Sequence, residues 1–435
     1  MPYEIIIGRD STDKKRFENK GLVHLGRGYV KMGNLTSLSN KILMDIVRSH
    51  VILVAGKRGS GKSYTLGALA EGLADLQDEA KRNVASLIFD TMGIFWTMKY
   101  PNEKDKQLLR EWNMETKNLP VKVFIPFGKE EEYMKKQIPF DETFALKPSE
   151  LKSEDWVTLF GLEMTSNSGV LIQRAIAKLQ NKESFIINDI QKEIEQDDRA
   201  SKETKDVAFS LFSAANNWGV FSRTEGGTEI SDLITAGTTT VLDVSVYSSI
   251  GAFNVRALVI SLISRKLFTS RMDSRKKEEL EDLRHGQDYL SFKGERKEPL
   301  VWIFIDEAHE FLPRTGKTPA TDALVQLLRE GRQPGISLVL ATQQPGQIHK
   351  DVMTQSDIVI AHRITAKPDI DALNEIMQTY LLKNIRQQID DLPALKGSAI
   401  ILDDNSERIY PIRVRPRLTW HGGEAPAAVK AEVQF

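Results

Sequence analysis

One octapeptide constrains the fold of this chain more than any other feature of its sequence: Gly56, Lys57, Arg58, Gly59, Ser60, Gly61, Lys62 and Ser63. It matches the pattern G-x-x-x-x-G-K-[ST] in full, between the apolar run Val51–Ala55 and a helical repeat of leucines that reaches Leu76. Such a strand–loop–helix unit curls backbone N–H groups around phosphate oxygens, and the helix N-terminus adds a positive dipole end. We call residues 56–63 the P-loop.

The P-loop residues have separate expected roles. Lys62 is expected to place its charge on the β- and γ-phosphates of a nucleotide, and Ser63 to offer its hydroxyl to Mg²⁺. The glycines leave room for the phosphates, so the segment from Gly56 to Tyr64 is predicted to bind ATP. A second possible phosphate loop, at Gly316-Lys317-Thr318, lacks the first glycine and a preceding strand, and is interpreted as a polar loop.

Short runs of β-branched and apolar residues alternate with helical patterns along most of the chain. Seven such runs are predicted to be strands: Val51–Ala55, Ala85–Asp90, Val121–Phe127, Thr238–Val244, Val301–Asp306, Ser337–Thr342 and Asp357–Ala361. Several are apolar throughout, as expected of strands that are covered on both faces of a parallel sheet. The sequence therefore predicts an α/β fold with a mostly parallel sheet and right-handed crossovers.

Departures from this alternation divide the chain. Residues 1–45 hold strand-like pieces and several glycines, and are predicted to be a short β-rich N-terminal segment. Residues 46–128 and 236–415 are predicted to form the α/β core. Between them, residues 129–235 show helical patterns and no convincing strand, which indicates a helical insertion. Residues 416–435 are expected to form an exposed C-terminal arm.

Composition excludes several classes of protein. With 59 Lys and Arg against 60 Asp and Glu, the chain carries a formal charge of −1, which excludes a histone-like protein but not a local basic channel. It has no cysteine, so disulfide scaffolds, iron–sulfur clusters and cysteine nucleophiles are excluded. No apolar run approaches the roughly 18 residues of a membrane span, and the first residues do not resemble a signal peptide. We therefore expect a cytoplasmic protein without a membrane partner.

Polar side chains follow two of the predicted strands. Asp306 and Glu307 end the apolar run that begins at Val301, at the edge where open α/β sheets bind ligands. Asp306 is expected to hold the Mg²⁺ shell and Glu307 to polarise the attacking water; the alternative is a solvated acidic pair that ends a strand. Gln343 follows the next apolar strand and is expected to orient the water or contact the γ-phosphate. The alternative for Gln343 is an ordinary turn amide.

The spacing of these parts separates the classes of nucleotide-binding protein. No Asn-Lys-x-Asp sequence that would contact a guanine base follows the P-loop, which disfavours a small GTPase. A Leu-Ser-Gly-Gly-Gln signature is also lacking, which disfavours an ABC transporter subunit. The glutamate beside Asp306 favours a motor-type ATPase over a simple kinase.

With these parts in place, the chain resembles the HerA/FtsK superfamily of hexameric DNA-pumping ATPases, and most of all its HerA-type members. The segments that carry the resemblance are the P-loop, Ile305–His309, Arg329–Arg332, Ala341–Pro345 and Arg417–Gly423. The resemblance implies a RecA-like core and a homo-hexameric ring with ATP between neighbours and double-stranded DNA through the middle. HerA proteins usually begin with a complete β-barrel, and the short segment before this core implies a reduced barrel.

The resemblance also implies an arginine that reaches the ATP of the neighbouring subunit. Arg332 is the first choice by its position in the motif and Arg329 the second, while Arg363 and Arg48 are weaker choices. The alternative for Arg332 is a residue that stabilises the C-terminal dipole of a helix.

A HerA-type protein is expected to work with a separate nuclease or effector protein, in DNA end processing or antiviral defence. The alternative is a regulatory ATPase scaffold that assembles or switches a partner without moving along DNA. The DNA contact is left open between the charge-dense stretch Arg271–Glu298, interpreted as a loop or partly ordered helix, and the loop Pro313–Pro319.

Overall fold

The computed structural model describes residues 3–32, 35–77, 79–248, 253–285, 298–377 and 385–423. Within these residues a single sheet of 13 strands runs through the molecule, in the order β1-β3-β2-β13-β12-β11-β4-β10-β9-β5-β8-β6-β7. The strands are β1 (Ile5–Ile7), β2 (Leu22–Met32), β3 (Leu35–Asp45), β4 (Val51–Ala55), β5 (Val84–Asp90), β6 (Val121–Pro126), β7 (Glu142–Phe144), β8 (Thr239–Asp243), β9 (Leu300–Ile305), β10 (Ile336–Thr342), β11 (Ile358–His362), β12 (Ser398–Asp403) and β13 (Arg408–Val414).

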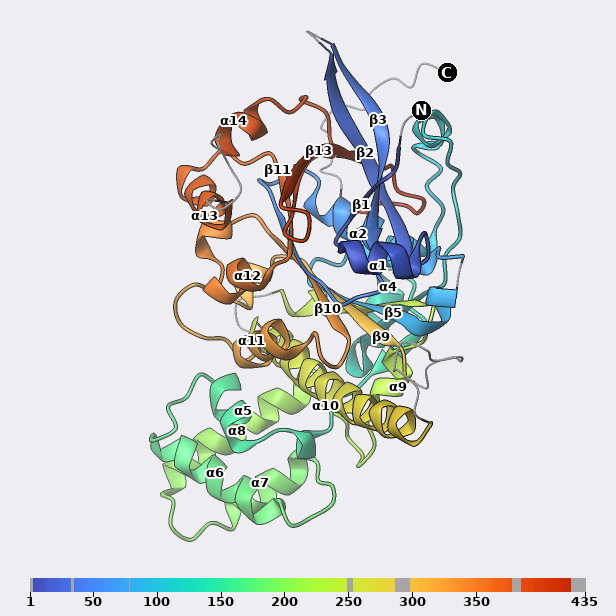
Figure 1. Cartoon of the computed structure of the whole chain (residues 1–435). Coiled ribbons are helices and arrows are strands. Elements are labelled where there is room, and N and C mark those ends of the chain that lie inside the picture. Colours follow the sequence, from blue (N-terminus) through green and yellow to red (C-terminus); the bar gives the residue numbers. More distant parts are fainter. Residues whose placement is uncertain are drawn as a thin grey trace.

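Helices cover both faces of the sheet (Figure 1). They are α1 (Ser11–Phe17), α2 (Lys62–Ala74), α3 (Lys106–Glu111), α4 (Glu130–Lys135), α5 (Ser153–Leu159), α6 (Asn167–Leu179), α7 (Ile187–Glu195), α8 (Lys202–Asn217), α9 (Ile230–Leu233), α10 (Phe253–His285), α11 (Thr321–Glu330), α12 (Lys350–Gln355), α13 (Lys367–Met377) and α14 (Ile385–Asp390). Among the described residues, no helix has both the length and the apolar character that a membrane crossing requires.

The centre of the sheet is parallel, as predicted. The strands from β11 through β4, β10, β9, β5 and β8 to β6 all run in the same direction. Each of the seven strands predicted from the sequence is confirmed, and each is a mainly β-branched or apolar run that leads into a polar residue or a turn. Strand β10 lies between β4, which leads into the P-loop, and β9, which leads into Asp306. The structure is therefore the expected RecA-like α/β core.

Side chains alternate between two buried layers, which fixes the register of the central strands. Along β10, Leu338 and Leu340 pack in the layer that also holds the insertion and helices α10 to α13, while Val339 and Ala341 pack in the layer that holds α2. A slip by one residue would exchange the two sets, so the register is strongly specified. The carboxyl ends of β4, β9 and β10 consequently meet at one edge, which we call the carboxyl edge. The opposite end of these strands is the amino edge.

The N-terminal segment differs from the expected reduced barrel. Strands β1, β2 and β3 continue the central sheet, because β2 pairs with β13, and the pairing order stays open from β1 to β7. The long β2–β3 hairpin rises from the body of the molecule at the end opposite the helical insertion (Figure 1). These strands therefore extend the core sheet and do not close into a separate unit.

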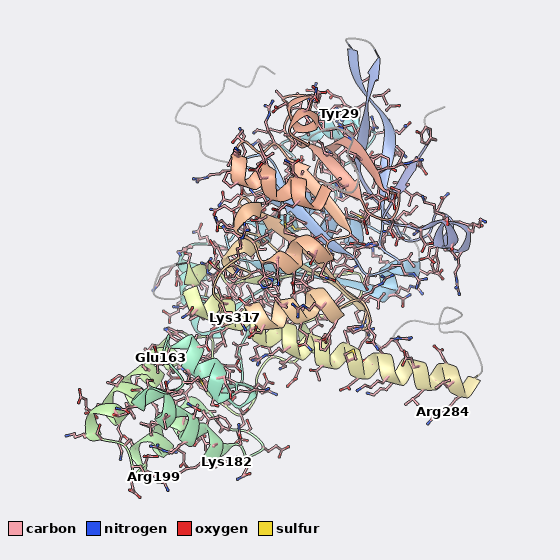
Figure 2. The ribbon with its side chains drawn as sticks, turned by 60° about the vertical axis from the view of Figure 1, so that its left-hand side comes forward. Tyr29, Glu163, Lys182, Arg199, Arg284 and Lys317 are labelled. Atoms are coloured by element: carbon pink, nitrogen blue, oxygen red, sulfur yellow. The ribbon has the colours of Figure 1, made fainter. Side chains whose placement is uncertain are left out.

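The predicted helical insertion contains helices, but its first boundary differs from the prediction. The predicted range 129–235 contains α4 and also β7, which pairs with β6 and belongs to the sheet. The helices α5 to α9 follow β7, and α5 and α9 contact α10, where Arg265 pairs with Asp155 at 2.8 Å. Figure 2 shows this insertion at one end of α10 and Arg284 at the other. The sequence missed β7 because only three residues pair.

Of two segments that were expected to be irregular, the first agrees with one of its alternatives, a partly ordered helix, and the second is corrected. The stretch from Arg271 continues α10 as far as His285, since pairs such as Arg275–Glu279 at 2.9 Å stabilise a charged helix; residues 286–297 lie outside the described residues. The first part of the C-terminal arm is buried and not exposed. Arg417, Leu418 and Thr419 are at most 2% exposed. Residues 424–435 lie outside the described residues.

A buried carboxylate explains the C-terminal segment. Glu71, in α2, accepts five hydrogen bonds, from the guanidinium groups of Arg415 and Arg417, the backbone N–H groups of Leu418 and Thr419, and the Thr419 hydroxyl. Burial alone would raise the pKa of Glu71, but the two arginines lower it to about 2. The end of the chain is thus bound to the helix that follows the P-loop.

Candidate functional site

The P-loop lies at the carboxyl edge, between β4 and α2. Gly59 and Gly61 have φ values of 74° and 112°, a region that side chains rarely adopt, so glycine is required at both turns. Gly56 is required for space, because a Cβ atom there would lie 2.4 Å from Ser60 Oγ and 2.7 Å from His362 Cβ. Lys62 begins α2, and its Nζ donates to the carbonyl oxygen of Lys57 across the loop at 3.3 Å. The predicted loop therefore has the curled shape that phosphate oxygens need.

Ser63 and Asp306 meet although 243 residues separate them in the chain. The Ser63 hydroxyl donates to Asp306 Oδ2 at 2.5 Å, and Asp306 Oδ1 accepts the backbone N–H of Glu307 at 2.9 Å. Both groups are hard oxygen donors at the mouth of the P-loop, and Mg²⁺ prefers one or two such protein ligands together with phosphate oxygens and water. These two residues therefore fit the predicted magnesium site.

Glu307 is held in a position that leaves its carboxylate available. Its backbone is left-handed, with φ 50°, a conformation that is uncommon for a residue other than glycine. Among the described residues, its buried Oε2 has no hydrogen-bond partner. Burial, reinforced by the charge of Asp306, raises the pKa of Glu307 to about 7. An acceptor that is buried and unsatisfied at the edge of a phosphate site is suited to receive a hydrogen bond from water.

His309 joins Glu307 to the end of β10 and was not singled out from the sequence. Its Nδ1 lies 3.5 Å from Glu307 Oε2 and 3.2 Å from the hydroxyl oxygen of Thr342. Gln343 follows Thr342 directly, and its backbone N–H donates a hydrogen bond to Glu307. This hydrogen bond offsets part of the rise that burial causes in the Glu307 pKa. The predicted pair of Glu307 and Gln343 is therefore assembled by adjacent strands. His309 ends the segment Ile305–His309 that carries the family resemblance, but the sequence analysis gave it no role of its own.

The sequence analysis also missed His362, which packs against the P-loop at Gly56. It is the last residue of β11 and is fully buried. Both ring nitrogens form hydrogen bonds: Nδ1 lies 3.0 Å from the carbonyl oxygen of Ser398, and Nε2 lies 2.9 Å from Thr65 Oγ1. Burial lowers the pKa of His362 to about 4, so the ring is neutral. Because a carbonyl oxygen only accepts, Nδ1 carries the proton and Nε2 accepts from the Thr65 hydroxyl.

The structure separates the arginine candidates by their position. Arg332 is exposed in the turn between α11 and β10, at the amino edge, so it lies at the opposite end of the strands from the P-loop. Arg329 donates to Asp351 at 2.6 Å, and Arg48 donates to Asp13 at 2.8 Å. Arg363 alone among the four follows a strand, β11, at the carboxyl edge.

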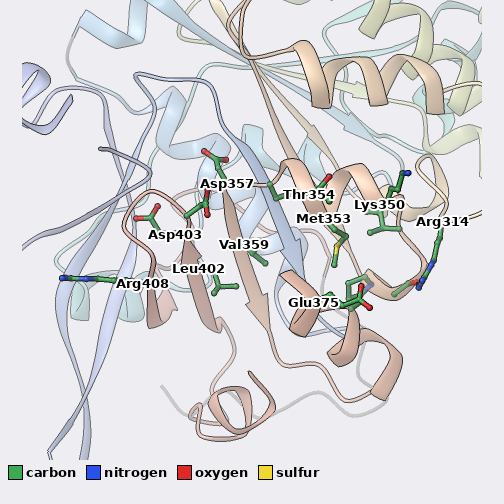
Figure 3. A pocket seen from close by; sticks show the side chains of 16 residues that line it. Arg314, Lys350, Met353, Thr354, Asp357, Val359, Glu375, Leu402, Asp403 and Arg408 are labelled. Carbon is green, nitrogen blue, oxygen red and sulfur yellow. The ribbon is translucent and has the colours of Figure 1, made fainter. Parts of the chain in front are cut away.

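A cavity of about 440 Å³ is lined by other residues than those of the P-loop, and Figure 3 shows the side chains around it. Its walls come from α12, α13 and the neighbouring ends of β11 and β12, with Val359, Met353 and Leu402 among the apolar residues. Pro345 and Gly346, just after Gln343, line it as well. The cavity thus adjoins the loop that follows β10.

Comparison with known proteins places the chain in one family. The family described as "Helicase HerA, central domain" matches residues 30–267, more than half of the chain. Among curated proteins, the DNA double-strand break repair helicase HerA of Pyrococcus furiosus is 28% identical over 149 residues, which cover 32% of this chain and 24% of that protein. The probable DNA double-strand break repair helicase HerA of Methanocaldococcus jannaschii is 31% identical over 105 residues, covering 23% of this chain and 21% of that protein. The aligned parts therefore span about a quarter of these relatives' length.

A solved structure extends the likeness of fold to nearly the whole chain. VirB4 of Thermoanaerobacter pseudethanolicus superposes with a TM-score of 0.57 at 12% identity, covering 92% of this chain and 97% of that one. At this identity the match shows the fold alone, and that fold is the P-loop ATPase core described above. Because the central-domain family spans more than half of the chain, this protein belongs to the HerA family and is a HerA-type P-loop ATPase of the HerA/FtsK superfamily.

Proposed function

We propose that this protein hydrolyses ATP and uses the energy to move double-stranded DNA. The observation that carries the proposal is the meeting of the P-loop, the acidic pair Asp306–Glu307 and Gln343 at one edge of the sheet. These are the parts that phosphoryl transfer to water requires: a cradle with a positive charge, a metal ligand pair, and groups that position the water.

Each residue has one task in the proposed reaction. Lys62 and the P-loop N–H groups bind the phosphates and neutralise their charge. Ser63 and Asp306 would hold Mg²⁺, which, when bound, offsets the negative charge of the phosphates. Glu307 accepts a hydrogen bond from the attacking water through its unsatisfied oxygen, and Gln343 orients that water from the neighbouring strand.

Two joined loops provide a surface for DNA. The backbone N–H of Arg314 donates to Gln347 at 2.7 Å, its guanidinium donates to Gly346 at 3.1 Å, and the N–H of His349 donates to Leu312 at 2.7 Å. The loop after β9 and the loop after β10 therefore form one unit, with Lys317 and Lys350 exposed on it. Contacts from such cations to phosphates, regardless of base sequence, suit a translocating motor.

We further propose that the chain works in the cytoplasm as a hexameric ring, with a separate nuclease or effector as its partner in DNA end processing or antiviral defence. The two HerA relatives are named as DNA double-strand break repair helicases, which supports the DNA substrate. In the ring, Arg332 would reach the ATP of the neighbour from the amino edge. Arg329 is the second choice, because it is already paired with Asp351.

The decisive experiment compares DNA with a protein partner as the activator. ATP turnover of the full chain is measured alone and with blunt duplex DNA, together with displacement of a third strand from a triplex. A motor should be strongly stimulated by duplex DNA and should displace the strand, whereas Lys62→Ala should do neither. Lys350→Glu should lose stimulation, while Lys182→Glu, on the far side of the insertion (Figure 2), should not. Turnover that ignores DNA and responds only to a co-purifying protein would favour the regulatory scaffold instead.

A further inference from the structure

One basic side chain at the carboxyl edge has no task in the proposed reaction. We propose that Arg363 binds the phosphates of ATP within its own subunit, from the side of the P-loop opposite to Asp306. This inference rests on the proposed ATP binding and deepens it, because it assigns a second side-chain cation to the same half of the site as Lys62.

Strand pairing places Arg363 beside the start of the P-loop. Strand β11 runs parallel to β4, with Ala361 opposite Ala55, so both strands end at the same level. The backbone N–H of Lys57 then donates to the carbonyl oxygen of Arg363 at 3.0 Å. Because β9 and β10 lie on the other side of β4, the loop is bounded by Asp306 on one side and by Arg363 on the other.

His362 fixes the position from which the Arg363 side chain starts. Its ring is held by hydrogen bonds to Thr65 and Ser398, and its Cβ atom packs where a side chain on Gly56 would lie. The backbone at the end of β11 is therefore packed against the P-loop on one side and bonded to β12 on the other. A side chain on such a rigid support reaches a bound ligand at a lower entropic cost than one on a free loop.

The guanidinium of Arg363 is exposed and is not committed to another group. Among the described residues it has neither a hydrogen bond nor an ion pair, in contrast to Arg48 with Asp13 and Arg329 with Asp351. Arginine presents a planar fork of donors that matches phosphate oxygens in a bidentate manner. An unpaired arginine next to a curled anion-binding loop is therefore well placed to bind the polyphosphate.

The first test is a nucleotide titration on the full chain. Arg363→Ala should raise the Kd for mant-ATP by roughly 10- to 100-fold, the range expected for a lost hydrogen-bonded charge, and Arg363→Lys should recover part of that loss. Arg284→Ala, an exposed arginine at the far end of α10 (Figure 2), is the matched control and should bind as the wild type does. Thermal melts should be alike for all variants, because Arg363 is exposed.

The titration separates this inference from the proposed function. If the wild type binds mant-ATP, Lys62→Ala does not, and Arg363→Ala binds as tightly as the wild type, the role of Arg363 is wrong while ATP binding stands. If the wild type itself does not bind mant-ATP, the proposed function fails. A loss of binding in Arg363→Ala that Arg363→Lys does not reduce at all would also count against a phosphate contact.

Mixing of inactive variants distinguishes action within a subunit from action across a boundary. The assay uses an ATP concentration well below the raised Kd of Arg363→Ala, so that both variants hydrolyse little ATP. Arg363→Ala and Lys62→Ala would damage the same half-site, so rings mixed from the two should stay as inactive as the separate variants. Arg332→Ala mixed with Lys62→Ala is the comparison, because those residues would come from different half-sites. Recovery of activity in the Arg363 mixture would overturn the assignment to the same subunit.

Discussion

The two edges of the central sheet differ in how their charged side chains are paired. At the amino edge, Arg9 donates to Asp45 at 2.7 Å, and His50 lies between Asp45 and Asp357, with Nδ1 2.6 Å from the latter. At the carboxyl edge, Glu307 keeps an unsatisfied buried oxygen and Arg363 keeps a free guanidinium among the described residues. Strand β4 begins beside the paired charges of the amino edge and ends beside the groups of the carboxyl edge.

Pairing is what distinguishes a structural charge from one that awaits a ligand. A buried charge is costly unless it is paired, so a closed network such as that of His50 ties elements together and has no capacity left for binding. An incompletely satisfied group at a phosphate-binding edge keeps that capacity. The amino edge therefore joins the N-terminal strands to the core, and the carboxyl edge is available for chemistry.

Arg332 is the strongest challenge to this division, because it is a cation at the amino edge with no partner among the residues that the structure describes. If it reaches the neighbour's ATP, Arg332→Ala should bind ATP and form rings yet hydrolyse about 10³- to 10⁵-fold more slowly, the range known for arginine fingers. Mixed rings with Lys62→Ala should recover part of the activity, measured as phosphate release. Confirmed exchange of subunits without any recovery would remove the assignment, and Arg329 would be tested next.

Glu307→Gln sharpens the comparison at the carboxyl edge. The amide keeps the size of the side chain but cannot act as a carboxylate acceptor, so turnover should fall about 10²- to 10⁴-fold while ATP binding stays largely intact. Lys62→Ala should lose both, since it removes the charge that binds the phosphates. Equal loss of nucleotide binding in the two variants, measured by titration, would contradict the separate roles.

Ser63→Ala tests the metal site with a smaller expected effect. Removing the hydroxyl takes one oxygen ligand from the proposed Mg²⁺ site and leaves Asp306, so the magnesium concentration for half-maximal turnover should rise by about 10-fold. Magnesium titration of ATPase activity measures the change, with Ser60→Ala as the control in the same loop. A magnesium requirement identical to that of the wild type would exclude Ser63 as a direct ligand.

The central strands and the nucleotide site could be predicted because their signals are local. Continuous apolar runs such as Val301–Ile305 end abruptly at polar residues, and parallel pairing then brings those residues to one edge. That reasoning placed Asp306 near Ser63 without any prediction of how the chain folds over the 243 positions that separate them. Roles in hydrolysis and in the ring stay predictions, because they depend on ligands and neighbours.

The parts that could not be predicted depend on distant partners. The segment after Val414 is rich in arginine, proline and glycine and suggests exposure, yet it is buried because Glu71 binds it from 344 or more residues away. Strand β13 mixes polar and apolar residues and becomes a strand by pairing with β2 and β12. His362 has no signal in its neighbourhood, since its partners Thr65 and Ser398 lie far off in the sequence.

The last prediction concerns the amino edge and affects stability, not turnover. Burial alone would lower the pKa of His50, but the charge of Asp357 and hydrogen bonds to Asp357 and Asp45 raise it to about 10. The group binds its proton more tightly in the folded state, so its contribution to stability is full below about pH 6.5 and is lost as the pH rises through about 10. The free energy of unfolding of the wild type should therefore fall between pH 7 and 9.5, by up to about 1.4 kcal/mol per pH unit. Urea unfolding at several pH values measures this slope.

His50→Leu should be about 3 kcal/mol less stable at pH 7, since it leaves Asp45 and Asp357 without their shared partner, and its free energy of unfolding should not show this pH dependence. His24→Gln is the matched control: burial lowers the pKa of His24 to about 4, so that ring is neutral throughout this range and its loss should leave the slope unchanged. A slope that survives in His50→Leu would show that the amino edge is not held together by a charged histidine, and the contrast between the two edges would lose its basis.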